Sequence, residues 1–198
     1  MGRQERFDRA DYGARYGEPS ETERPRAGAP PGRSLPSQEN PRAQEAPRLV
    51  WPIARAALQR VGDSVLASRD ARGRPHKGVD LFAAAGTEVH AARGGQVLRV
   101  VDGRTSASEA QRRAGLFVDV LGKDTLLYRY LHLDATRVRA GDSVGQGAVL
   151  GVVAPPHTSG LADAPHLHFE IRQADYDRAR KDYGAPVEPL RLLPPLRA

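Results

Sequence analysis

Short stretches in which apolar and polar residues alternate recur along the chain from residue 78 onward. Successive side chains of a strand point to opposite faces, so this alternation is typical of half-buried strands. The stretches are residues 78–82, 88–91, 96–101, 116–121, 125–131, 148–153 and 166–172. Glycine-rich or polar turns separate them, and many short strands joined in this way predict an all-β sandwich or barrel.

The rest of the pattern predicts where the folded part begins and where helices interrupt it. The folded part is expected to start at Leu49, with a strand beginning over 49–53 and a second short strand over 61–66. Two stretches, 106–114 and 174–183, are candidates for helices. Both are expected to be surface insertions on the β scaffold.

The first 48 residues differ from the rest in composition. They hold seven Pro and five Gly and few large apolar residues. Such a segment cannot bury enough apolar surface to offset its ordering entropy. The sequence therefore predicts a disordered tail or tether over 1–48 and a folded domain over 49–198. The alternative is a short amphipathic helix around 5–16, which would be a docking or inhibitory element.

Charge and cysteine content narrow the classes of function. The net charge is +6, but acidic residues are mixed with the basic ones throughout, and no basic run has interleaved aromatics. A nucleic-acid partner is therefore not expected. The chain has no Cys, so His and carboxylate side chains would have to hold any transition metal.

Hydropathy predicts a soluble chain. No stretch approaches the length of a membrane span, and the first 25 residues lack the apolar core of a signal peptide. If the protein works outside the cytoplasm, its export signal has been removed from this sequence or is of a kind that the residues do not reveal.

The candidate chemistry is concentrated in polar residues that interrupt the predicted strands. Alternation places His166, His168 and Glu170 on one face of the strand over 166–172, opposite three apolar side chains. Two imidazoles side by side on a strand are either two metal ligands or one ligand and one acid/base partner. Taken alone, the pair also fits a plain surface strand.

Two further strings carry the same kind of signal. In His76-Lys77-Gly78-Val79-Asp80 the even spacing lets His76 and Asp80 face the same side, with Gly78 leaving an open space for a metal, although a surface turn fits as well. In Tyr130-Leu131-His132-Leu133, alternation predicts that Tyr130 and His132 share a face. A lone strand His is more often a structural hydrogen-bonding residue than a catalyst.

Considered together, the three strings favour a metal site. Four of the six His residues and one Asp interrupt β-type alternation. A zinc site with two His and one carboxylate is thus available, and with a fourth position open to water it is of the catalytic type.

At these residues the chain, from about 51 to 189, resembles the lysostaphin-type zinc metallopeptidases. This family of peptidoglycan endopeptidases includes LytM-like enzymes. The resembling pieces occur in the family's order: Trp51-Pro52, His76-x-Gly-x-Asp80, Gly86-Thr87-x-Val89-x-Ala91 with Gly95, Tyr130-x-His132-Leu133, Val138-x-x-Gly141-Asp142-x-Val144-x-x-Gly147-x-x-Leu150-Gly151, and His166-Leu167-His168-Phe169-Glu170. Each piece is weak alone, but the ordered set is specific.

The resemblance implies both a fold and a set of roles. The fold is an antiparallel β-sandwich or barrel-sandwich hybrid. One Zn²⁺ per chain is held by His76, Asp80 and His168, while His132 and His166 are catalytic. Tyr130, a weaker assignment, orients His132 or contacts substrate. Glu170 is either a partner behind a ligand His or a solvated strand residue.

The activity implied is zinc-dependent hydrolysis of amide bonds in peptidoglycan stem peptides or cross-links. A metal-activated water would attack the carbonyl, with His as general base and as stabiliser of the oxyanion. The implied location is the cell envelope, periplasmic or secreted. Envelope proteins are possible partners through residues 1–48.

The chain departs from the family pattern in two segments. Residues 154–164 replace a Gly- and Ser-rich loop that would form one wall of the cleft, so substrate preference does not carry over. Residues 103–114 are interpreted as an insertion near the cleft, and His157 as a residue of its rim.

Two other functions compete with the endopeptidase. Some family members have lost zinc ligands and regulate or scaffold other cell-wall hydrolases, so a non-catalytic or latent regulator is the main alternative. A biotinyl or lipoyl carrier shares the hairpin pattern of 138–153. Its modifiable Lys would have to be Lys123, whose flanking residues are wrong for that role.

Overall fold

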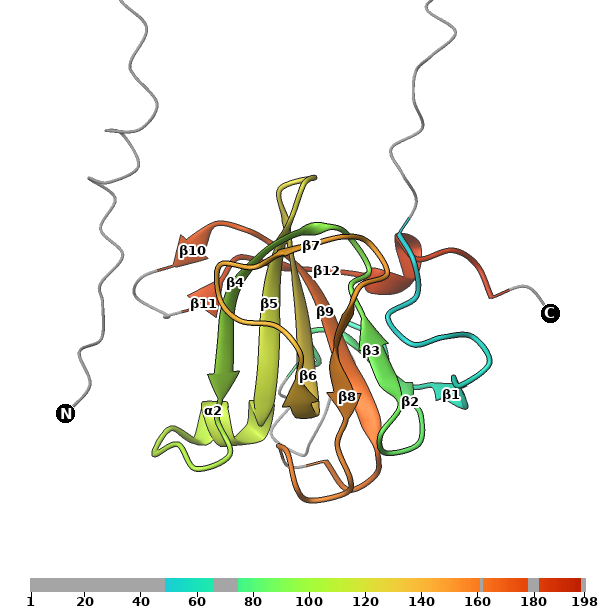
Figure 1. Ribbon diagram of the computed structural model, residues 1–198, viewed down its shortest axis with the longest axis vertical. Helices are drawn as coiled ribbons and strands as arrows, with labels where there is room; N and C mark the ends of the chain where they lie inside the picture. The colour runs from blue at the N-terminus through green and yellow to red at the C-terminus, as the bar shows by residue number, and fades with distance from the viewer. Residues whose placement is uncertain (1–48, 66–74, 161, 178–181, 197–198) are drawn as a thin grey trace, which may run out of the picture. The chain divides into compact units, whose positions relative to one another are not determined.

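The computed structural model describes residues 49–65, 75–160, 162–177 and 182–196 (Figure 1). The predicted tail over 1–48, with the alternative helix around 5–16, lies outside these residues. In the described part of the chain, no helix is long and apolar enough to cross a membrane.

Strands make up nearly all of the regular structure, as the alternation predicted. They are β1 (Arg60–Val61), β2 (Val79–Phe82), β3 (Glu88–His90), β4 (Gly95–Asp102), β5 (Leu116–Gly122), β6 (Leu126–Thr136), β7 (Ser143–Val144), β8 (Val149–Val153), β9 (His166–Gln173), β10 (Tyr176–Asp177), β11 (Asp182–Tyr183) and β12 (Pro186–Val187). The described helices are α2 (Glu109–Ala114) and the 3-10 helix η1 (Pro189–Arg191).

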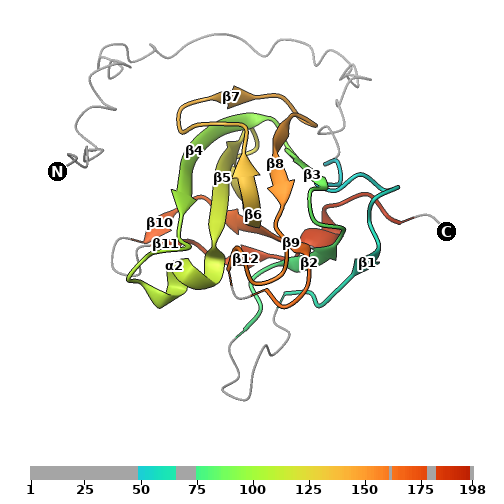
Figure 2. The same ribbon diagram turned by 60° about the horizontal axis from the view of Figure 1, so that its bottom comes forward.

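The strands form a ten-stranded sheet and a separate two-stranded one, β10–β11. In the large sheet the order is β1-β2-β9-β6-β5-β4-β7, with β12 also paired to β9, and β8 paired to both β6 and β3. Every pairing is antiparallel. Figures 1 and 2 show that the large sheet curls instead of lying flat. The predicted all-β, antiparallel class is confirmed.

Strand β9 separates the core from the polar face of the sheet. Its apolar residues Leu167, Phe169 and Ile171 are fully buried in the hydrophobic core. The Phe169 ring lies 5.2 Å from the ring of Tyr130, centroid to centroid. Because side chains alternate along the strand, the intervening polar residues of β9 project from the opposite face.

Strand β6 carries a bulge at His132. Between Tyr130 and Leu133, β6 takes three steps where the opposing strand β5 takes two. His132 has a φ of 64°, in the left-handed region that residues other than glycine seldom adopt. The extra residue reverses the alternation, so Tyr130 faces the core while His132 lines a cavity on the other side. The prediction that Tyr130 and His132 share a face is therefore wrong.

Neither strand expected at the start of the domain forms as predicted. Residues 49–53 form no strand; Val50 N–H donates a single hydrogen bond to the Ala92 carbonyl, and the Trp51 ring N–H donates to the Pro194 carbonyl. This segment is held by buried side chains, including Ile53, instead of by a ladder of main-chain bonds. Of 61–66, only Val61 belongs to a strand, and residue 66 lies outside the described part.

The helix expected over 174–183 is not present in the described residues of that range, 174–177 and 182–183, and the rest of the range lies outside the described part. Its described residues form the hairpin β10–β11, in which residue 176 opposes 183 and residue 177 opposes 182. A helix here would have no apolar stripe to bury. The extended form instead lets Asp182 accept hydrogen bonds from Arg129 and Lys77. The other expected helix, over 106–114, is present in part as α2.

Gly78 lies against the main chain of β9 and not beside the open space that its spacing suggested. A Cβ built at Gly78 would lie 2.2 Å from the carbonyl oxygen of Phe169. Only a residue without a side chain can approach β9 so closely. Because of this close approach, His76 and Asp80, which flank Gly78, lie next to strand β9.

We predict that Gly78→Ala destabilises the fold by about 3 kcal/mol, because the new methyl group can be accommodated only if backbone moves. Urea unfolding followed by circular dichroism measures the change. Gly145→Ala is the matched control: a Cβ there meets nothing within 4 Å, so the expected change is below about 0.5 kcal/mol. Equal stability of the two variants would contradict this account of Gly78.

Candidate metal centre and cleft

Antiparallel pairing of β2 with β9 brings three of the predicted site residues together. Asp80 lies directly opposite His168, so their side chains share a face. Asp80 Oδ1 is 2.8 Å from His168 Nδ1 and 3.3 Å from His76 Nε2, and the two ring nitrogens are 3.0 Å apart. One ligand atom from each residue lies within 4.8 Å of the others, and all three residues are buried.

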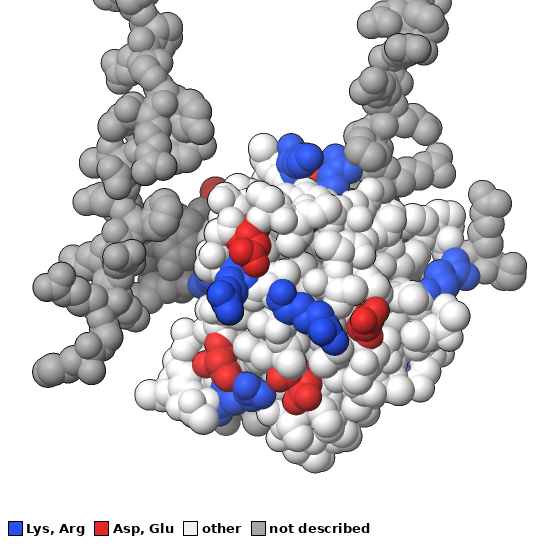
Figure 3. All heavy atoms as spheres, viewed as in Figure 1, with Lys and Arg blue, Asp and Glu red and all other residues white. Residues whose placement is uncertain are grey.

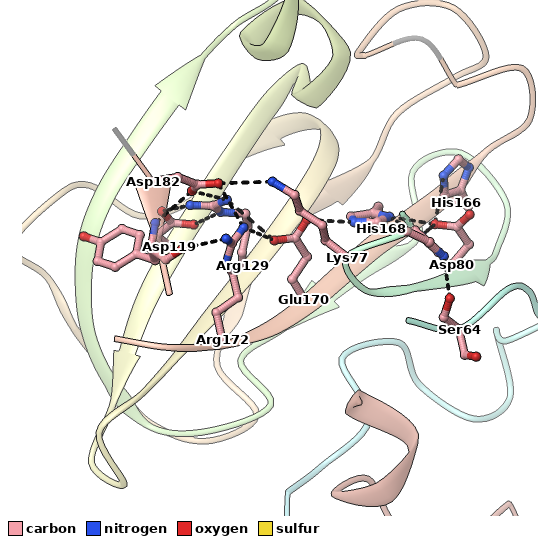
Figure 4. A network of polar contacts seen from close by, with 12 residues as sticks. Ser64, Lys77, Asp80, Asp119, Arg129, His166, His168, Glu170, Arg172 and Asp182 are labelled. Carbon is pink, nitrogen blue, oxygen red and sulfur yellow. Dashed lines mark hydrogen bonds and ion pairs between the residues drawn. The ribbon is translucent and has the colours of Figure 1, made fainter. Parts of the chain in front are cut away.

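Hydrogen bonds on the far side of each ring fix which imidazole nitrogen faces the cluster. His76 Nδ1 is 3.1 Å from the Ser64 carbonyl oxygen, which can only accept, so this nitrogen carries the proton. His168 Nε2 is 3.0 Å from Glu170 Oε1 and donates to it (Figure 4). The other nitrogen of each ring is thereby directed at Asp80, at the position from which it would bind a metal held by that carboxylate.

The cluster keeps its carboxylates ionised although they are buried. Burial alone would raise the pKa of Asp80, but hydrogen bonds from His168 and His76 outweigh it and hold that pKa far below its usual value. The pKa of Glu170 falls to about 2, because its bond with His168 and the charges of Arg129 and Arg172 overcome the effect of burial. Burial lowers the pKa of His168, but the bonds to Asp80 and Glu170 raise it by more.

The two His residues predicted to be catalytic lie next to this cluster. His166 Nδ1 donates to the Ala164 carbonyl at 2.8 Å, and its Nε2 is 3.6 Å from Asp80 Oδ1. The His132 ring is 4.9 Å from the His166 ring and 5.9 Å from the His168 ring, centroid to centroid. The structure therefore brings all four predicted His residues and Asp80 into one group.

The loop over 154–164 packs on His132 from outside. A Cβ built at Gly160 would lie 2.3 Å from His132 Nδ1, and the φ of Gly160 is +72°. Ser159, which is buried, anchors the loop by accepting a hydrogen bond from Leu116 N–H at 2.9 Å. His157 is exposed, with Nδ1 3.7 Å from Asp163 Oδ1. The loop thus packs against His132, but none of its described residues, His157 included, is among those that line the cleft.

Two of the metal-ligand candidates, His76 and His168, line one end of a cleft with a volume of about 460 Å³. Its floor is the polar face of the sheet, from Arg99 on β4 to His168 on β9. Helix α2 contributes Gln111 and Arg113 to one wall, and Lys77 and Asp182 line the cleft as well. The segment 103–114, interpreted from the sequence as an insertion near the cleft, does lie at the cleft.

A row of alternating charges crosses the floor of this cleft. Arg99, Asp119, Arg129 and Glu170 lie directly opposite one another on β4, β5, β6 and β9. Asp119 Oδ2 accepts from Arg99 Nε at 2.6 Å and Asp119 Oδ1 accepts from Arg129 Nε at 2.8 Å. Arg129 is also 3.5 Å from Glu170, which bonds His168. Figure 4 shows this network running into the metal-ligand candidates.

Sequence reasoning missed this row, except for Glu170. Its signal was present: Asp119 interrupts the apolar run Phe117-Val118-Asp119-Val120-Leu121, and Arg129 interrupts Leu126 to Leu131 in the same way. A charge in the middle of a buried strand requires a partner. The partner could not be named without the register of the strands. On the face seen in Figure 3, acidic and basic side chains are intermixed, with no continuous basic surface.

Tyr130 does not occupy the place predicted for it. Its side chain is fully buried in the core, and its hydroxyl accepts a hydrogen bond from Ala92 N–H at 2.9 Å. It therefore neither orients His132 nor contacts a substrate in the cleft. The bulge at His132 is the cause. Of the two interpretations of Glu170, the structure favours the partner behind a ligand His.

A curled antiparallel sheet that carries a His–Asp–His cluster has the ligand set of a metallopeptidase-type protein. The family model of peptidase family M23 matches residues 74–189, which is more than half of the chain. The chain therefore belongs to peptidase family M23, as its resemblance to the lysostaphin-type enzymes predicted.

Two relatives show how far this similarity extends. The chain is 31% identical over 98 residues to the peptidoglycan DD-endopeptidase ShyC of Vibrio cholerae, a match covering 50% of this chain and 20% of that protein. It is 34% identical over 110 residues to the cell division protein DipM of Caulobacter vibrioides, covering 55% of this chain and 17% of that protein. The similarity thus spans about a fifth of these relatives.

Solved structures share the fold at lower identity. The catalytic domain of lysostaphin from Staphylococcus simulans superposes with a TM-score of 0.54 at 24% identity, covering 67% of this chain and 90% of that one. A zinc-containing peptidase from Vibrio cholerae gives a TM-score of 0.55 at 23% identity, covering 71% and 39%.

Asp182, which pairs with Arg129 of the charged row, is predicted to make a pH-dependent contribution to stability. Burial alone would raise the pKa of Asp182, but the charges of Arg129 and Arg172 outweigh it and lower that pKa from 3.8 to about 2. A lowered folded-state pKa gives stability that is present above the unfolded-state pKa and is lost as the pH falls through the folded-state pKa.

We therefore predict that Asp182→Asn is less stable than wild type by about 1 kcal/mol at pH 6, a figure discounted for the partial exposure of Asp182. The difference should shrink steadily between pH 4 and pH 2. Urea titrations at pH 6, 4, 3 and 2 measure it. A difference that stays constant over this range would mean that Asp182 stabilises the fold by packing and not by charge.

Proposed function

We propose that this chain is a zinc-dependent endopeptidase that hydrolyses amide bonds in the stem or cross-link peptides of peptidoglycan. One observation carries the proposal: His76, Asp80 and His168 converge at one end of a cleft, with two more imidazoles beside them. A relative named as a peptidoglycan DD-endopeptidase supports the choice of substrate.

The donor set fits one zinc ion per chain held by His76, Asp80 and His168. Two imidazole nitrogens and one carboxylate are a ligand set of catalytic zinc sites. Each ring already directs one nitrogen into the cluster, because its other nitrogen is bonded to Ser64 or Glu170. Asp80 is ionised at neutral pH, as a ligand must be.

The remaining two imidazoles supply the proton transfers. Zinc, when bound, would polarise the amide carbonyl and make water a stronger nucleophile at neutral pH. His166 Nδ1–H donates a hydrogen bond to the Ala164 carbonyl, so the Nε2 of the same ring can accept the proton of the attacking water. That proton then passes to the leaving amine nitrogen. His132, whose ring lies next to that of His166, donates a hydrogen bond to the carbonyl oxygen of the substrate as it becomes negative.

The same proposal places the protein in the cell envelope, periplasmic or secreted, because that is where peptidoglycan lies. Envelope proteins would be its partners through residues 1–48. We also propose that the chain is divided into a tail over 1–48 and a domain over 49–198.

A second candidate function is that of a non-catalytic or latent regulator of other cell-wall hydrolases. The similarity to a protein named for its part in cell division favours it, because that name states no hydrolytic activity. The filled His–Asp–His set argues for the enzyme.

Elemental analysis and digestion of purified peptidoglycan, with and without a chelator, separate the two functions. The enzyme predicts about one zinc per chain and release of free amines that the chelator abolishes. A chain that holds no zinc and releases no amines would overturn the enzyme and favour the regulator.

The division of roles predicts different outcomes for two His variants. His168→Ala should lose both zinc and activity, because it removes a ligand. His132→Ala should keep zinc while its activity falls by about 100-fold to 10,000-fold, the usual contribution of one acid/base residue. Zinc content and amine release on the same samples test both. If His132→Ala loses zinc as fully as His168→Ala, the catalytic role of His132 is wrong.

Glu170 is predicted to support zinc binding through His168. Glu170→Gln keeps the size of the side chain but removes the charge that His168 Nε2–H faces, so zinc affinity should fall about 10-fold to 100-fold. Competition with a chromophoric chelator measures the affinity directly. Glu88→Gln, on an exposed carboxylate of β3, is the control and should leave it unchanged. Unchanged affinity in Glu170→Gln would contradict the role given to Glu170.

A further inference from the structure

Arg99 stands at the end of the cleft floor away from the metal-ligand candidates. It lies on β4, and β5 and β6 separate it from β9, which carries His168. Its side chain is 31% exposed, whereas that of Arg129 in the same row is 8% exposed. Arg99 is thus the most exposed member of the row.

The surroundings of Arg99 hold its guanidinium group in place. Nε donates to Asp119, whose side chain is fully buried. The guanidinium carbon lies 5.3 Å from the ring centroid of Phe117 and 5.3 Å from that of Tyr183. An arginine fixed by a carboxylate and two aromatic rings loses little side-chain entropy when it binds a ligand.

The charge of Arg99 is only partly balanced within the row. Asp119 is its ion-pair partner among the described residues, and Arg129 shares that carboxylate. In the described part of the chain, the hydrogen bond of Arg99 uses Nε, which leaves the two terminal nitrogens to face a ligand. Those nitrogens form a planar fork that matches a carboxylate.

We propose that Arg99 is the recognition site for a free carboxylate of the peptide substrate. This inference rests on the proposed function, because it specifies which peptides the cleft prefers. Three steps between neighbouring strands separate Arg99 from β9, or roughly 14 Å. An extended peptide covers this distance in about four residues, so the carboxylate recognised lies a few residues from the bond that is cut.

The other charges of the cleft lining are largely paired among themselves. Lys77 and Arg129 contact Asp182, and Arg113 contacts Glu109. One guanidinium is matched by one carboxylate, so the chemistry favours an acidic peptide.

The experiment uses the full zinc-loaded chain and three matched synthetic cross-link peptides. One has free carboxylates, the second has its side-chain carboxylate amidated, and the third has its C-terminal carboxylate amidated. The readout is the ratio of kcat/KM for the free peptide to kcat/KM for each amide. Wild type should prefer the free peptide to one of the amides by about 10-fold to 100-fold, the usual effect of one charge-assisted hydrogen bond.

Variants of Arg99 assign that preference to its side chain. Arg99→Gln should bring the ratio to within about twofold of one, and Arg99→Lys should keep only part of it, because Lys retains the charge without the fork. Arg139→Gln, an exposed residue outside the cleft, is the control and should keep the wild-type ratio. The amide for which the wild-type ratio is high identifies the carboxylate that Arg99 recognises. Thermal melting of each variant verifies that it is folded.

Failure of this inference can be told apart from failure of the proposed function. If wild type cleaves all three peptides equally, or if Arg99→Gln keeps the preference, then Arg99 does not recognise a carboxylate. The proposed endopeptidase activity is still supported in that case. If wild type cleaves none of them, the proposed function fails. In that case, calorimetry measures the dissociation constants of the intact free and amidated peptides, and their ratio replaces the ratio of kcat/KM. Equal constants for free and amidated peptides overturn the inference in that case too.

Discussion

The pairing of β2 with β9 is the constraint on which the site depends. It sets Asp80 opposite His168 and therefore decides that a carboxylate and an imidazole meet on the polar face of the sheet. A slip of one residue would turn His168 into the core and place an apolar side chain beside Asp80. The same register also requires Gly78, because the chain must pass against the backbone of Phe169 to bring in His76. The fold and the site are thus specified by the same contacts.

The row of charges ties the site to the rest of the sheet. Glu170 bonds His168 on one side and Arg172 on the other, and Arg129 connects it to Asp119. Burying so many charges is favourable only when each has its partner in good geometry. The network therefore demands that four strands hold their register together. A rigid floor of this kind is what a site needs if its ligand atoms are to stay in place.

Much of this arrangement could be predicted from the sequence, and the failures have physical causes. Period-two alternation found most of the long strands and the polar face of β9, because local alternation is enough to separate core from solvent. The order of the motifs identified the family. Alternation failed at Tyr130, where a bulge inserts one residue, since nothing local marks a positive φ at His132. It failed again at 174–183, where ion pairs with distant arginines outweigh helix propensity. Partners such as Asp119 and Arg129 could not be named because strand register is not a local property.

The backbone conformation of His132 has a consequence for how this protein can evolve. A histidine in the left-handed region is less stable than a glycine there by about 1 kcal/mol or more. Replacement by glycine would therefore relax the backbone while it removes an imidazole from the cleft. Selection for stability alone would favour replacement of His132 by glycine. The imidazole in the cleft is thus present at a cost in backbone stability.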